Sequence, residues 1–343
     1  MKNENNIIEI NDLHVEFQVR KKLSRKDIEA GIGNAVRAVD GVTIDFRRGE
    51  ILAVAGESGC GKTTLGKTIL QLNTPTAGTI EYNGRDLASL SKKELKDLRS
   101  RLQMVYQDPY ESLNPRQNVY DALMEPLKIH CKDMPQEEKD RRIYGIMEKV
   151  GLKPVEMMAQ RYPHHLSGGQ RQRLAIAATM ILEPEFVIAD EPVSMLDVSI
   201  RAEIIKLLLD LQKSGDVTYM FITHDLSLAW MIADRIAVFY LGKLVEIGPS
   251  DEMVHHSTHP YTTALVSVIP EIGAGGEHTR ERHVLEGETP SPLDVPEGCR
   301  FHTRCWYYNE KGCPAICREQ EPELTQVGED HMSACHFAME RSL

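Results

Sequence analysis

A glycine-rich segment near residue 60 carries the residue types that cradle phosphate. Its members are Gly56, Glu57, Ser58, Gly59, Cys60, Gly61, Lys62, Thr63 and Thr64. The segment follows the apolar run 51–55 and fits G-x-x-x-x-G-K-[ST], the Walker A pattern between a strand and a helix. Glycines let backbone N–H groups approach phosphate closely, and a helix N-terminus adds its dipole. We expect Lys62 to reach the β- and γ-phosphates of a nucleotide and Thr63 to hold Mg²⁺.

A pair of acids follows a second apolar run further along the chain. Residues 186–189 are apolar and lead into Asp190 and Glu191, which is the Walker B pattern. Asp190 would bind Mg²⁺, and Glu191 is placed to polarise the attacking water as general base. On its own, an acidic pair at a strand end is more often a helix cap or a solvated turn. The prediction therefore depends on the phosphate-binding segment upstream.

The string L-S-G-G-Q lies between these two patterns, directly before a predicted helix over 171–182. Its candidate anion-binding members are Ser167, Gly168, Gly169 and Gln170. A serine and two glycines at a helix N-terminus form a concavity that binds anions. The alternative is an N-cap with a flexible turn, which explains the serine and the glycines but not the whole string.

Because L-S-G-G-Q stands between Walker A and Walker B, residues 7–250 resemble the ATPases of ABC transporters. Three further elements of that family occur in the expected order. Gln107 in Y-Q-D-P resembles the Q-loop, and Asp197 in S-M-L-D resembles the D-loop. His224 in I-T-H-D resembles the switch histidine, which would contact the γ-phosphate. The alternative for His224 is a histidine that merely satisfies its hydrogen bonds at a strand end.

The resemblance implies that two such domains pair head to tail, with ATP and Mg²⁺ between Walker A of one and the signature string of the other. Ser167 would then touch the γ-phosphate of ATP bound to the partner domain. Thr63, Gln107 and Asp190 would hold Mg²⁺, and Gln107 would link the metal and the water to a membrane subunit. The implied catalytic side chains are Glu191, Gln107 and the switch histidine.

Alternation of strand-like and helix-like segments predicts an α/β fold. Strands are expected over 6–19, 36–46, 51–55, 186–189 and 218–222, and helices over 91–101, 136–150 and 200–213. The resemblance implies a P-loop NTPase with a RecA-like core, a helical subdomain over about 108–183 and an N-terminal antiparallel β subdomain. The basic run Arg20–Lys26 and the residues up to Gly33 predict a solvated loop.

A change of composition near residue 255 predicts a domain boundary. Beyond it the sequence is rich in proline, glycine, glutamate and histidine, and shows little periodicity. We therefore expect an ATP-binding domain over 1–255 and a small cysteine-rich C-terminal region over 256–343.

Longer strings narrow the resemblance to the F-type ATP-binding subunits of bacterial and archaeal dipeptide and oligopeptide importers. They are Q-D-P-Y-E-S-L-N-P from Gln107, E-P-V-S-M-L-D-V-S from Glu191, H-P-Y-T from His259 and G-C-R-F-H-T-R-C from Gly298. This resemblance implies peptide import with two permeases, a second ATPase subunit that is identical or a sister chain, and an extracytoplasmic peptide-binding protein. The chain would work at the cytoplasmic face of the cell membrane. Segment 110–127 is the expected permease contact.

Two other functions stay open at this point. Nickel importers share many of these strings, so nickel is the alternative substrate. A soluble ABC ATPase acting on nucleic acid or ribosomes is a third reading, but the single cassette and the net charge of −11 count against it. No signal peptide is expected, because the N-terminus lacks an apolar core after a basic start. Charged residues interrupt the most apolar stretch, 217–248, so no membrane span is expected.

Five of the seven cysteines crowd into the last 45 residues: Cys299, Cys305, Cys313, Cys317 and Cys335. Without a predicted secretory signal, such a cluster indicates a metal or cofactor site rather than disulfides. The absence of paired C-x2-C motifs disfavours a zinc ribbon, although Cys313 and Cys317 have half-site spacing. The resembled family carries a [4Fe–4S] cluster, which implies Cys299, Cys305, Cys317 and Cys335 as ligands, with Cys313 as the competitor. Zinc or reduced structural thiols are the alternatives.

Overall fold

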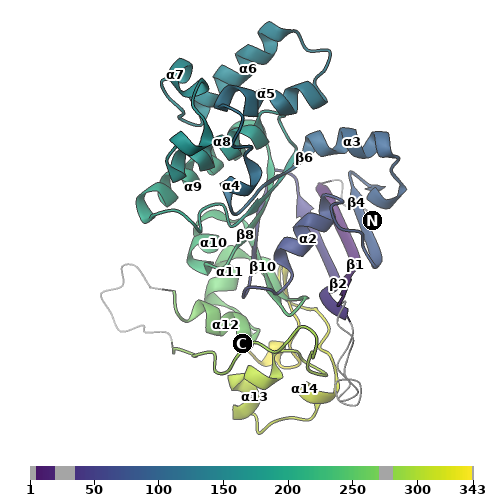
Figure 1. Ribbon diagram of the computed structural model, residues 1–343. Helices are drawn as coiled ribbons and strands as arrows, with labels where there is room; N and C mark the ends of the chain where they lie inside the picture. Colours follow the sequence, from purple (N-terminus) through teal and green to yellow (C-terminus); the bar gives the residue numbers. More distant parts are fainter. Residues whose placement is uncertain (1–4, 20–34, 270–280, 342–343) are drawn as a thin grey trace. The chain divides into compact units, whose positions relative to one another are not determined.

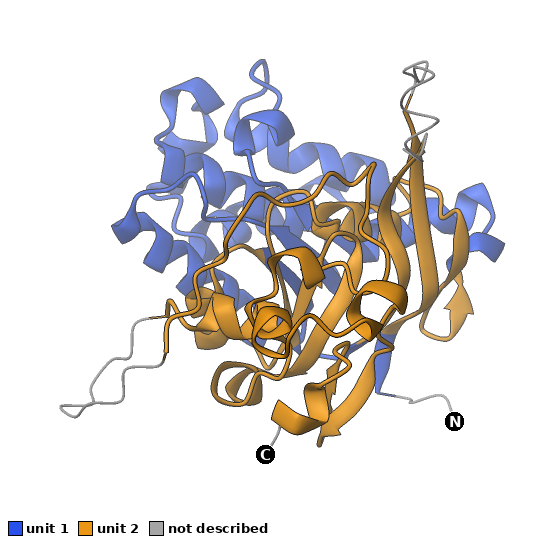
Figure 2. Ribbon diagram, turned by 90° about the horizontal axis from the view of Figure 1, so that it is seen from below, with its two compact units in different colours: residues 1–7, 46–50, 87–222 blue, residues 8–45, 51–86, 223–343 orange. Residues whose placement is uncertain are grey.

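The computed structural model describes residues 5–19, 35–269 and 281–341. The predicted loop that contains Arg20–Lys26 lies outside the described residues. Two compact units interleave along the sequence, coloured separately in Figure 2. Unit 1 comprises Met1–Ile7, Phe46–Glu50 and Leu87–Ile222, and unit 2 comprises Ile8–Asp45, Ile51–Asp86 and Thr223–Leu343.

Parallel strands form the centre of unit 1. β7 (Phe186–Asp190) pairs in parallel with both β6 (Leu102–Val105) and β8 (Thr218–Thr223). Every residue of β7 and β8 is buried, as expected of strands that are covered on both faces. The strands predicted over 186–189 and 218–222 are confirmed.

Helices make up most of the rest of unit 1. They are α3 (Lys92–Arg101), α4 (Pro109–Ser112), α5 (Val119–His130), α6 (Gln136–Lys149), α7 (Val155–Ala159), α8 (Gly168–Met180) and α9 (Val198–Gly215), with short 3₁₀ turns η1 (Leu87–Ser89) and η2 (Pro163–His165). A capping box opens α3, within the helix predicted over 91–101: Ser91 Oγ accepts from the Glu94 N–H and the Glu94 carboxylate accepts from the Ser91 N–H. Figure 1 shows α4 to α8 grouped together, and α5, α6 and α8 pack on one another.

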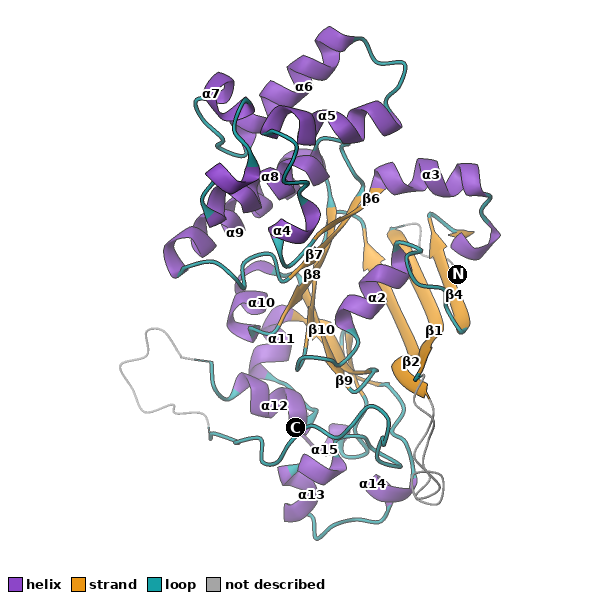
Figure 3. Ribbon diagram, viewed as in Figure 1, coloured by secondary structure: helices purple, strands orange, loops and turns teal. Residues whose placement is uncertain are grey.

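An antiparallel sheet forms the N-terminal part of the fold, as the resemblance implied. Its strand order is β2-β1-β4-β5. The strands are β1 (Asn6–Gln18), β2 (Ala35–Arg47), β4 (Ala77–Tyr82) and β5 (Arg85–Asp86). Figure 3 shows β1, β2 and β4 side by side. Buried side chains alternate with exposed or half-buried ones along much of β2, which is the pattern of a sheet with one covered face.

Another series of paired strands in unit 2 leads from the Walker A strand to strands near the end of the chain. β3 (Ile51–Ala55) pairs in parallel with β9 (Arg235–Tyr240), which pairs antiparallel with β10 (Lys243–Pro249). β10 in turn pairs with β12 (His331–Ser333), and β12 with β11 (Thr325–Gly328). Residues after the predicted boundary near 255 therefore extend the same sheet.

Short helices complete unit 2: α2 (Lys62–Ile69), α10 (Leu226–Ile232), α11 (Ser250–His255), α12 (Pro260–Val266), η3 (His302–Arg304), α13 (Trp306–Glu310), α14 (Ile316–Glu319) and α15 (Ala338–Arg341). Among the described residues, the helices after residue 255 have seven residues or fewer, which is too short to produce the periodicity that a sequence reading detects. Within the described ranges, no helix combines the length and apolar character needed to cross a membrane.

Candidate functional site

The Walker A loop connects β3 to α2 in unit 2, in the strand–turn–helix context that the pattern predicts. Gly61 is the N-cap of α2 with a φ of 106°, a left-handed conformation that favours glycine. A Cβ atom at Gly61 would collide with the carbonyl oxygen of Ala38. The loop therefore requires glycine at this position for conformation and for space.

The Lys62 side chain stabilises the loop by donating hydrogen bonds to backbone carbonyl oxygens of the loop. Its buried Nζ donates to the carbonyl oxygens of Gly56 at 2.7 Å and Glu57 at 2.9 Å, and lies 3.6 Å from Cys60 Sγ. Burial raises the pKa of the Cys60 thiol despite the nearby ammonium, so this sulfur stays protonated at neutral pH. The lysine thus sits at the centre of the turn that the glycines shape.

The Walker B acids and the Q-loop glutamine meet in unit 1. Asp190 is the buried last residue of β7, and Glu191 follows with a φ of 44°. The Glu191 N–H donates to the carbonyl oxygen of Ile222 at 3.0 Å, which fixes the turn. Gln107 Nε2 donates to Glu191 Oε2 at 3.1 Å. The structure therefore places the predicted general base and the predicted Q-loop residue in direct contact.

The signature string begins α8 as a capping box. Ser167 Oγ accepts from the Gln170 N–H at 3.3 Å, and Gln170 Oε1 accepts from the Ser167 N–H at 3.1 Å. The helix starts at Gly168 and not at residue 171 as predicted, because this cap stabilises a turn that contains both glycines, including Gly169. The N-cap alternative thus describes the local geometry, and it leaves the helix N-terminus available to an anion.

The remaining predicted residues also lie at helix starts. Asp197 is the N-cap of α9 and accepts from the Ile200 N–H at 3.1 Å and from Ser199 Oγ at 2.7 Å. These hydrogen bonds hold the pKa of Asp197 below its usual value, and the one from the Ile200 N–H has the largest effect. His224 is exposed directly after β8, before Asp225, which caps α10. The structure thus positions each element of the nucleotide-site pattern at a strand end or helix start.

Comparison with known proteins agrees with this arrangement. The ABC transporter family model matches residues 39–194, and the model for the C-terminal region of oligopeptide/dipeptide transporters matches residues 245–313. The oligopeptide transport ATP-binding protein AppF of Bacillus subtilis is 44% identical over 336 residues, which cover 98% of each chain. The chain belongs to the ABC transporter ATPases that carry this C-terminal region.

Two further comparisons support the assignment. The dipeptide transport ATP-binding protein DppF of Escherichia coli is 43% identical over 96% of this chain and 93% of its own. The structure of cbiO1 from Clostridium perfringens, part of the ABC transporter complex cbiONQ, matches with a TM-score of 0.60 and 27% identity, over 72% of this chain and 90% of its own. As an ABC ATPase, the chain has the P-loop NTPase fold and hydrolyses ATP with Mg²⁺.

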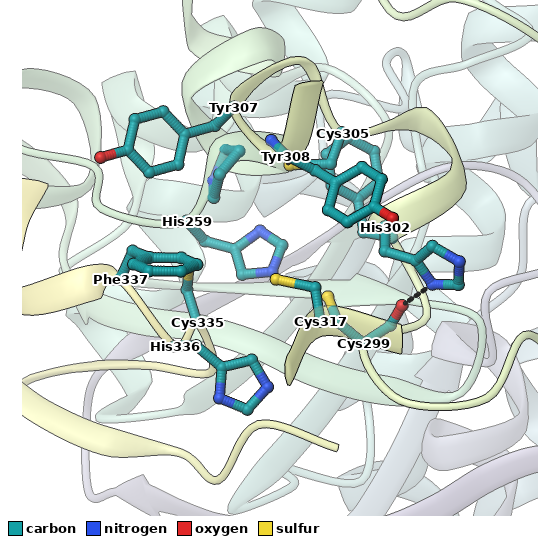
Figure 4. A pocket seen from close by; sticks show the side chains of 12 residues that line it. His259, Cys299, His302, Cys305, Tyr307, Tyr308, Cys317, Cys335, His336 and Phe337 are labelled. Atoms are coloured by element: carbon teal, nitrogen blue, oxygen red, sulfur yellow. Dashed lines mark hydrogen bonds between the residues drawn. The ribbon is translucent and has the colours of Figure 1, made fainter. Parts of the chain in front are cut away.

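Four cysteines of this ABC ATPase line one pocket in unit 2, namely Cys299, Cys305, Cys317 and Cys335. They come from the loop before η3, the N-cap of α13, the interior of α14 and the residues after β12. Aromatic and histidine side chains, among them His259 and Phe337, line the same pocket. Figure 4 shows the sulfur atoms of Cys299 and Cys317 turned into the pocket beside the His259 ring.

A backbone hydrogen bond joins two of the cysteine segments, and a local hydrogen bond holds the Cys305 sulfur at the start of α13. The Cys299 N–H donates to the Cys317 carbonyl oxygen at 2.9 Å, and Tyr308 N–H donates to Cys305 Sγ at 3.4 Å. Gly298 has a φ of 66°, and a Cβ there would lie 2.6 Å from the Cys317 carbonyl oxygen. Glycine is therefore required where the two segments approach.

Burial controls the protonation of these thiols. It raises the pKa of Cys299 to about 12 and of Cys305 and Cys335 to about 11, and it also raises the pKa of Cys317. At neutral pH the thiols are therefore uncharged, and any metal that binds must displace protons.

Cys313, the competing ligand, lies elsewhere. Its thiol is exposed, its φ is 59°, and it is not among the residues that line the pocket. In the part of the chain that the structure describes, no three cysteine, histidine or acidic side chains are arranged closely enough to hold a metal ion as they stand. The donor set suits a thiolate-ligated group, but its sulfur atoms would have to converge to bind one.

Two contacts to the Walker A loop escaped the sequence analysis. Arg304 forms an ion pair with Glu57, and the Tyr261 hydroxyl accepts from the Glu57 N–H at 3.0 Å. Both residues belong to strings that had been noted only as family resemblance. The sequence gives no sign that they would contact residues more than 200 positions away.

Proposed function

We propose that this ATPase energises the uptake of dipeptides or oligopeptides through partner permeases. The observation that carries the proposal is the end-to-end match to an oligopeptide transport ATP-binding protein, together with the matching C-terminal region over 245–313. We further propose that residues 1–255 form the ATP-binding domain, with its helical subdomain over about 108–183, and that 256–343 form the C-terminal region.

In this function the Walker A loop binds the phosphates of ATP. The N–H groups around Gly59 and Gly61 face the phosphates, Lys62 reaches the β- and γ-phosphates, and Thr63 ligates Mg²⁺. Asp190 supplies a second contact to the metal. The strand–turn–helix geometry and the burial of the lysine support these roles.

Glu191 acts as the general base on the attacking water, and Gln107 orients it. Their hydrogen bond supports this pairing, because the amide orients the carboxylate that is proposed to take a proton from the water. Gln107 also contacts Mg²⁺ and links the metal to the membrane subunit. His224, exposed at the end of β8, contacts the γ-phosphate.

The signature string serves a second ATPase subunit. Ser167 and the helix N-terminus that it caps bind the γ-phosphate of ATP held by that subunit, which is identical or a sister chain. Asp197 lies at the same interface. Two ATP molecules close the pair, and their hydrolysis reopens it.

The partners follow from this function. They are two permease subunits, the second ATPase subunit and, indirectly, an extracytoplasmic peptide-binding protein, so the chain works at the cytoplasmic face of the membrane. The permease contact is segment 110–127, where Tyr110 is 60% exposed. Motion at Gln107 reaches this segment through Asp108, which caps α4 by accepting from the Tyr110 N–H at 2.8 Å.

Transport measurements test the peptide assignment. We expect the chain to co-purify with permease subunits and to support uptake of labelled di- or oligopeptides in cells or proteoliposomes. The Glu191→Gln variant should assemble but not transport. Uptake of nickel without uptake of peptide, or assembly with no membrane subunit, would contradict the proposal.

We also propose that the cysteine pocket binds a [4Fe–4S] cluster through Cys299, Cys305, Cys317 and Cys335. The four thiols line one pocket free of carboxylates, which supports a soft thiolate-ligated group. When bound, the cluster would cross-link four segments of the C-terminal region and could exchange an electron. The four cysteines would hold their segments together through bonds to the cluster, and the surrounding rings would exclude water.

Metal analysis tests this second proposal. Protein purified without oxygen should be brown, with about four iron and four sulfide per chain. Colourless protein containing zinc would support the zinc alternative and contradict the cluster. Protein with neither metal would leave the cysteines as reduced structural thiols.

A further inference from the structure

The segment 299–305 joins the cysteine pocket to the Walker A loop. Cys299 and Cys305 line the pocket, while Arg304 forms a two-pronged ion pair with Glu57. Arg304 Nη1 lies 2.8 Å from Glu57 Oε2, and Nη2 lies 3.0 Å from Oε1. The Arg304 side chain is only 7% exposed and that of Glu57 25%, so water and salt screen the pair weakly.

All three polar groups of Glu57 are occupied. Its N–H donates to the Tyr261 hydroxyl at 3.0 Å, its carbonyl oxygen accepts from Lys62 Nζ at 2.9 Å, and its carboxylate also accepts from Thr289 Oγ1. Burial alone would raise the pKa of Glu57, but the hydrogen bonds from Arg304 and Thr289 lower it further than burial raises it. The carboxylate therefore stays charged at neutral pH.

The same segment also acts near the other end of the loop. Arg300 is buried and donates to the Leu241 carbonyl oxygen and to the Asp40 carboxylate. The adjacent Gly242 N–H donates to the Cys60 carbonyl oxygen at 3.0 Å. Arg304 thus contacts the loop directly at Glu57. Arg300 supports it indirectly at Cys60, through the turn that contains Leu241 and Gly242.

We propose that Arg304 is a positioning residue for the nucleotide, which acts through Glu57 on the Walker A loop. The carbonyl oxygen of Glu57 holds the Lys62 ammonium, so fixing Glu57 also fixes the group that must meet the phosphates. A loop that is ordered before the ligand arrives loses less conformational entropy on binding, which tightens binding. The inference rests on the proposed phosphate-binding role of this loop.

The Arg304→Gln variant tests the positioning role, because it removes the charge and the two-pronged contact while keeping an unbranched polar side chain. We expect the Kd of the full-length chain for MgATP, and the KM of the assembled transporter, to rise about tenfold. The kcat should change less than about twofold, because the residues proposed to activate water are not contacted by Arg304. Arg304→Lys keeps the charge but not the fork, and should restore part of the affinity.

Two further variants guard against a misleading loss of structure. Arg341→Gln removes another arginine of the C-terminal region, whose guanidinium donates to the Thr258 carbonyl oxygen and to Thr263 Oγ1, each at 2.8 Å. It should keep the wild-type Kd. Glu57→Gln breaks the same ion pair from the loop side, and combining it with Arg304→Gln should add little to the loss of affinity.

Several outcomes decide the question. Wild-type affinity in Arg304→Gln, or a loss of kcat at unchanged Kd, would overturn the positioning role. Equal losses in Arg304→Gln and Arg341→Gln would also overturn it, since they would report general loosening of the region. Lys62→Ala tests separately the proposal that the Walker A loop binds the phosphates of ATP. Wild-type affinity for MgATP in that variant would overturn the Walker A assignment itself.

Discussion

Gln107 donates a hydrogen bond to Glu191 across 3.1 Å, although 84 positions separate the two residues. Each side chain follows one of two neighbouring parallel strands, and Val105 of β6 stands opposite Ala189 of β7. The carboxyl ends of adjacent parallel strands meet at one edge of a sheet, where α/β proteins bind their ligands. The pairing of the two strands therefore brings the proposed base and its proposed orienting residue together.

Loss of this contact should slow hydrolysis more than it weakens ATP binding. We expect Gln107→Ala to lower kcat roughly tenfold, because the Glu191 carboxylate loses the donor that orients it. Gln326→Ala is the control, since Gln326 Nε2 makes a similar 3.1 Å hydrogen bond to the Gly328 carbonyl oxygen at an exposed position outside the proposed nucleotide site and permease contact. Steady-state ATPase assays on the assembled transporter measure both. Equal ATPase rates in the two variants would show that Gln107 has no role in hydrolysis.

The cysteine pocket predicts which thiol matters for metal content. Cys317→Ser should lower the iron and sulfide of anaerobically purified protein well below the wild-type amounts, because Cys317 lines the pocket. Cys313→Ser is the control and should leave both unchanged, because that thiol is exposed outside the pocket lining. The reverse result would make Cys313 the ligand and would contradict the proposed set.

A buried glutamate ties the C-terminal strands to β10. Glu246 is fully buried and accepts from the Thr258 N–H and from Thr258 Oγ1 at 2.7 and 2.9 Å, and His331 Nε2 lies 2.9 Å away. Glu246→Gln should lower the free energy of unfolding by about 3 kcal/mol, because it breaks a buried charged network. Glu252→Gln, at an exposed position on α11, should change it little. Denaturant unfolding of the full-length chain measures both.

The Glu246 carboxylate should also make the stability of the protein depend on pH. Burial alone would raise the pKa of Glu246, but the hydrogen bond from His331 and the other donors lower it more, so the folded-state pKa lies below the ordinary value of 4.5. The unfolded state then takes up the proton first as the pH falls, so the contribution is present above pH 4.5 and is lost below it. The difference in stability between wild type and Glu246→Gln should be constant from pH 7 to 5 and shrink at lower pH. A difference that grows on acidification would contradict this sign.

The parts of this fold that depend on residues close together in the sequence were the most predictable. The Walker A turn depends on glycines and a lysine within seven residues, and the capping box of α3 depends on Ser91 and Glu94 alone. The boundary of a helix was predicted less accurately. Helix α8 begins at Gly168, three residues before its predicted start, because its cap extends it over two glycines that have low helix propensity.

Contacts between distant residues had no local signal. The ion pair of Arg304 with Glu57 spans 247 positions, and the pairing of β12 with β10 joins strands of three and seven residues. β12 is too short to show alternation, β10 is buried along nearly its whole length, and an arginine next to a cysteine gives no hint of its partner. The organisation of the C-terminal region could therefore be recognised by resemblance but not built from the sequence.

The most direct test of the account is ATP turnover in the Glu191→Gln variant. We predict that kcat falls by a factor of about 100 or more, because the carboxylate that takes the proton from water is lost, while the Kd for MgATP stays near the wild-type value. Glu203→Gln, at an exposed position on α9, serves as the control with normal turnover. Wild-type turnover in Glu191→Gln would show that this residue is not the general base and would contradict the mechanism proposed for this ATPase.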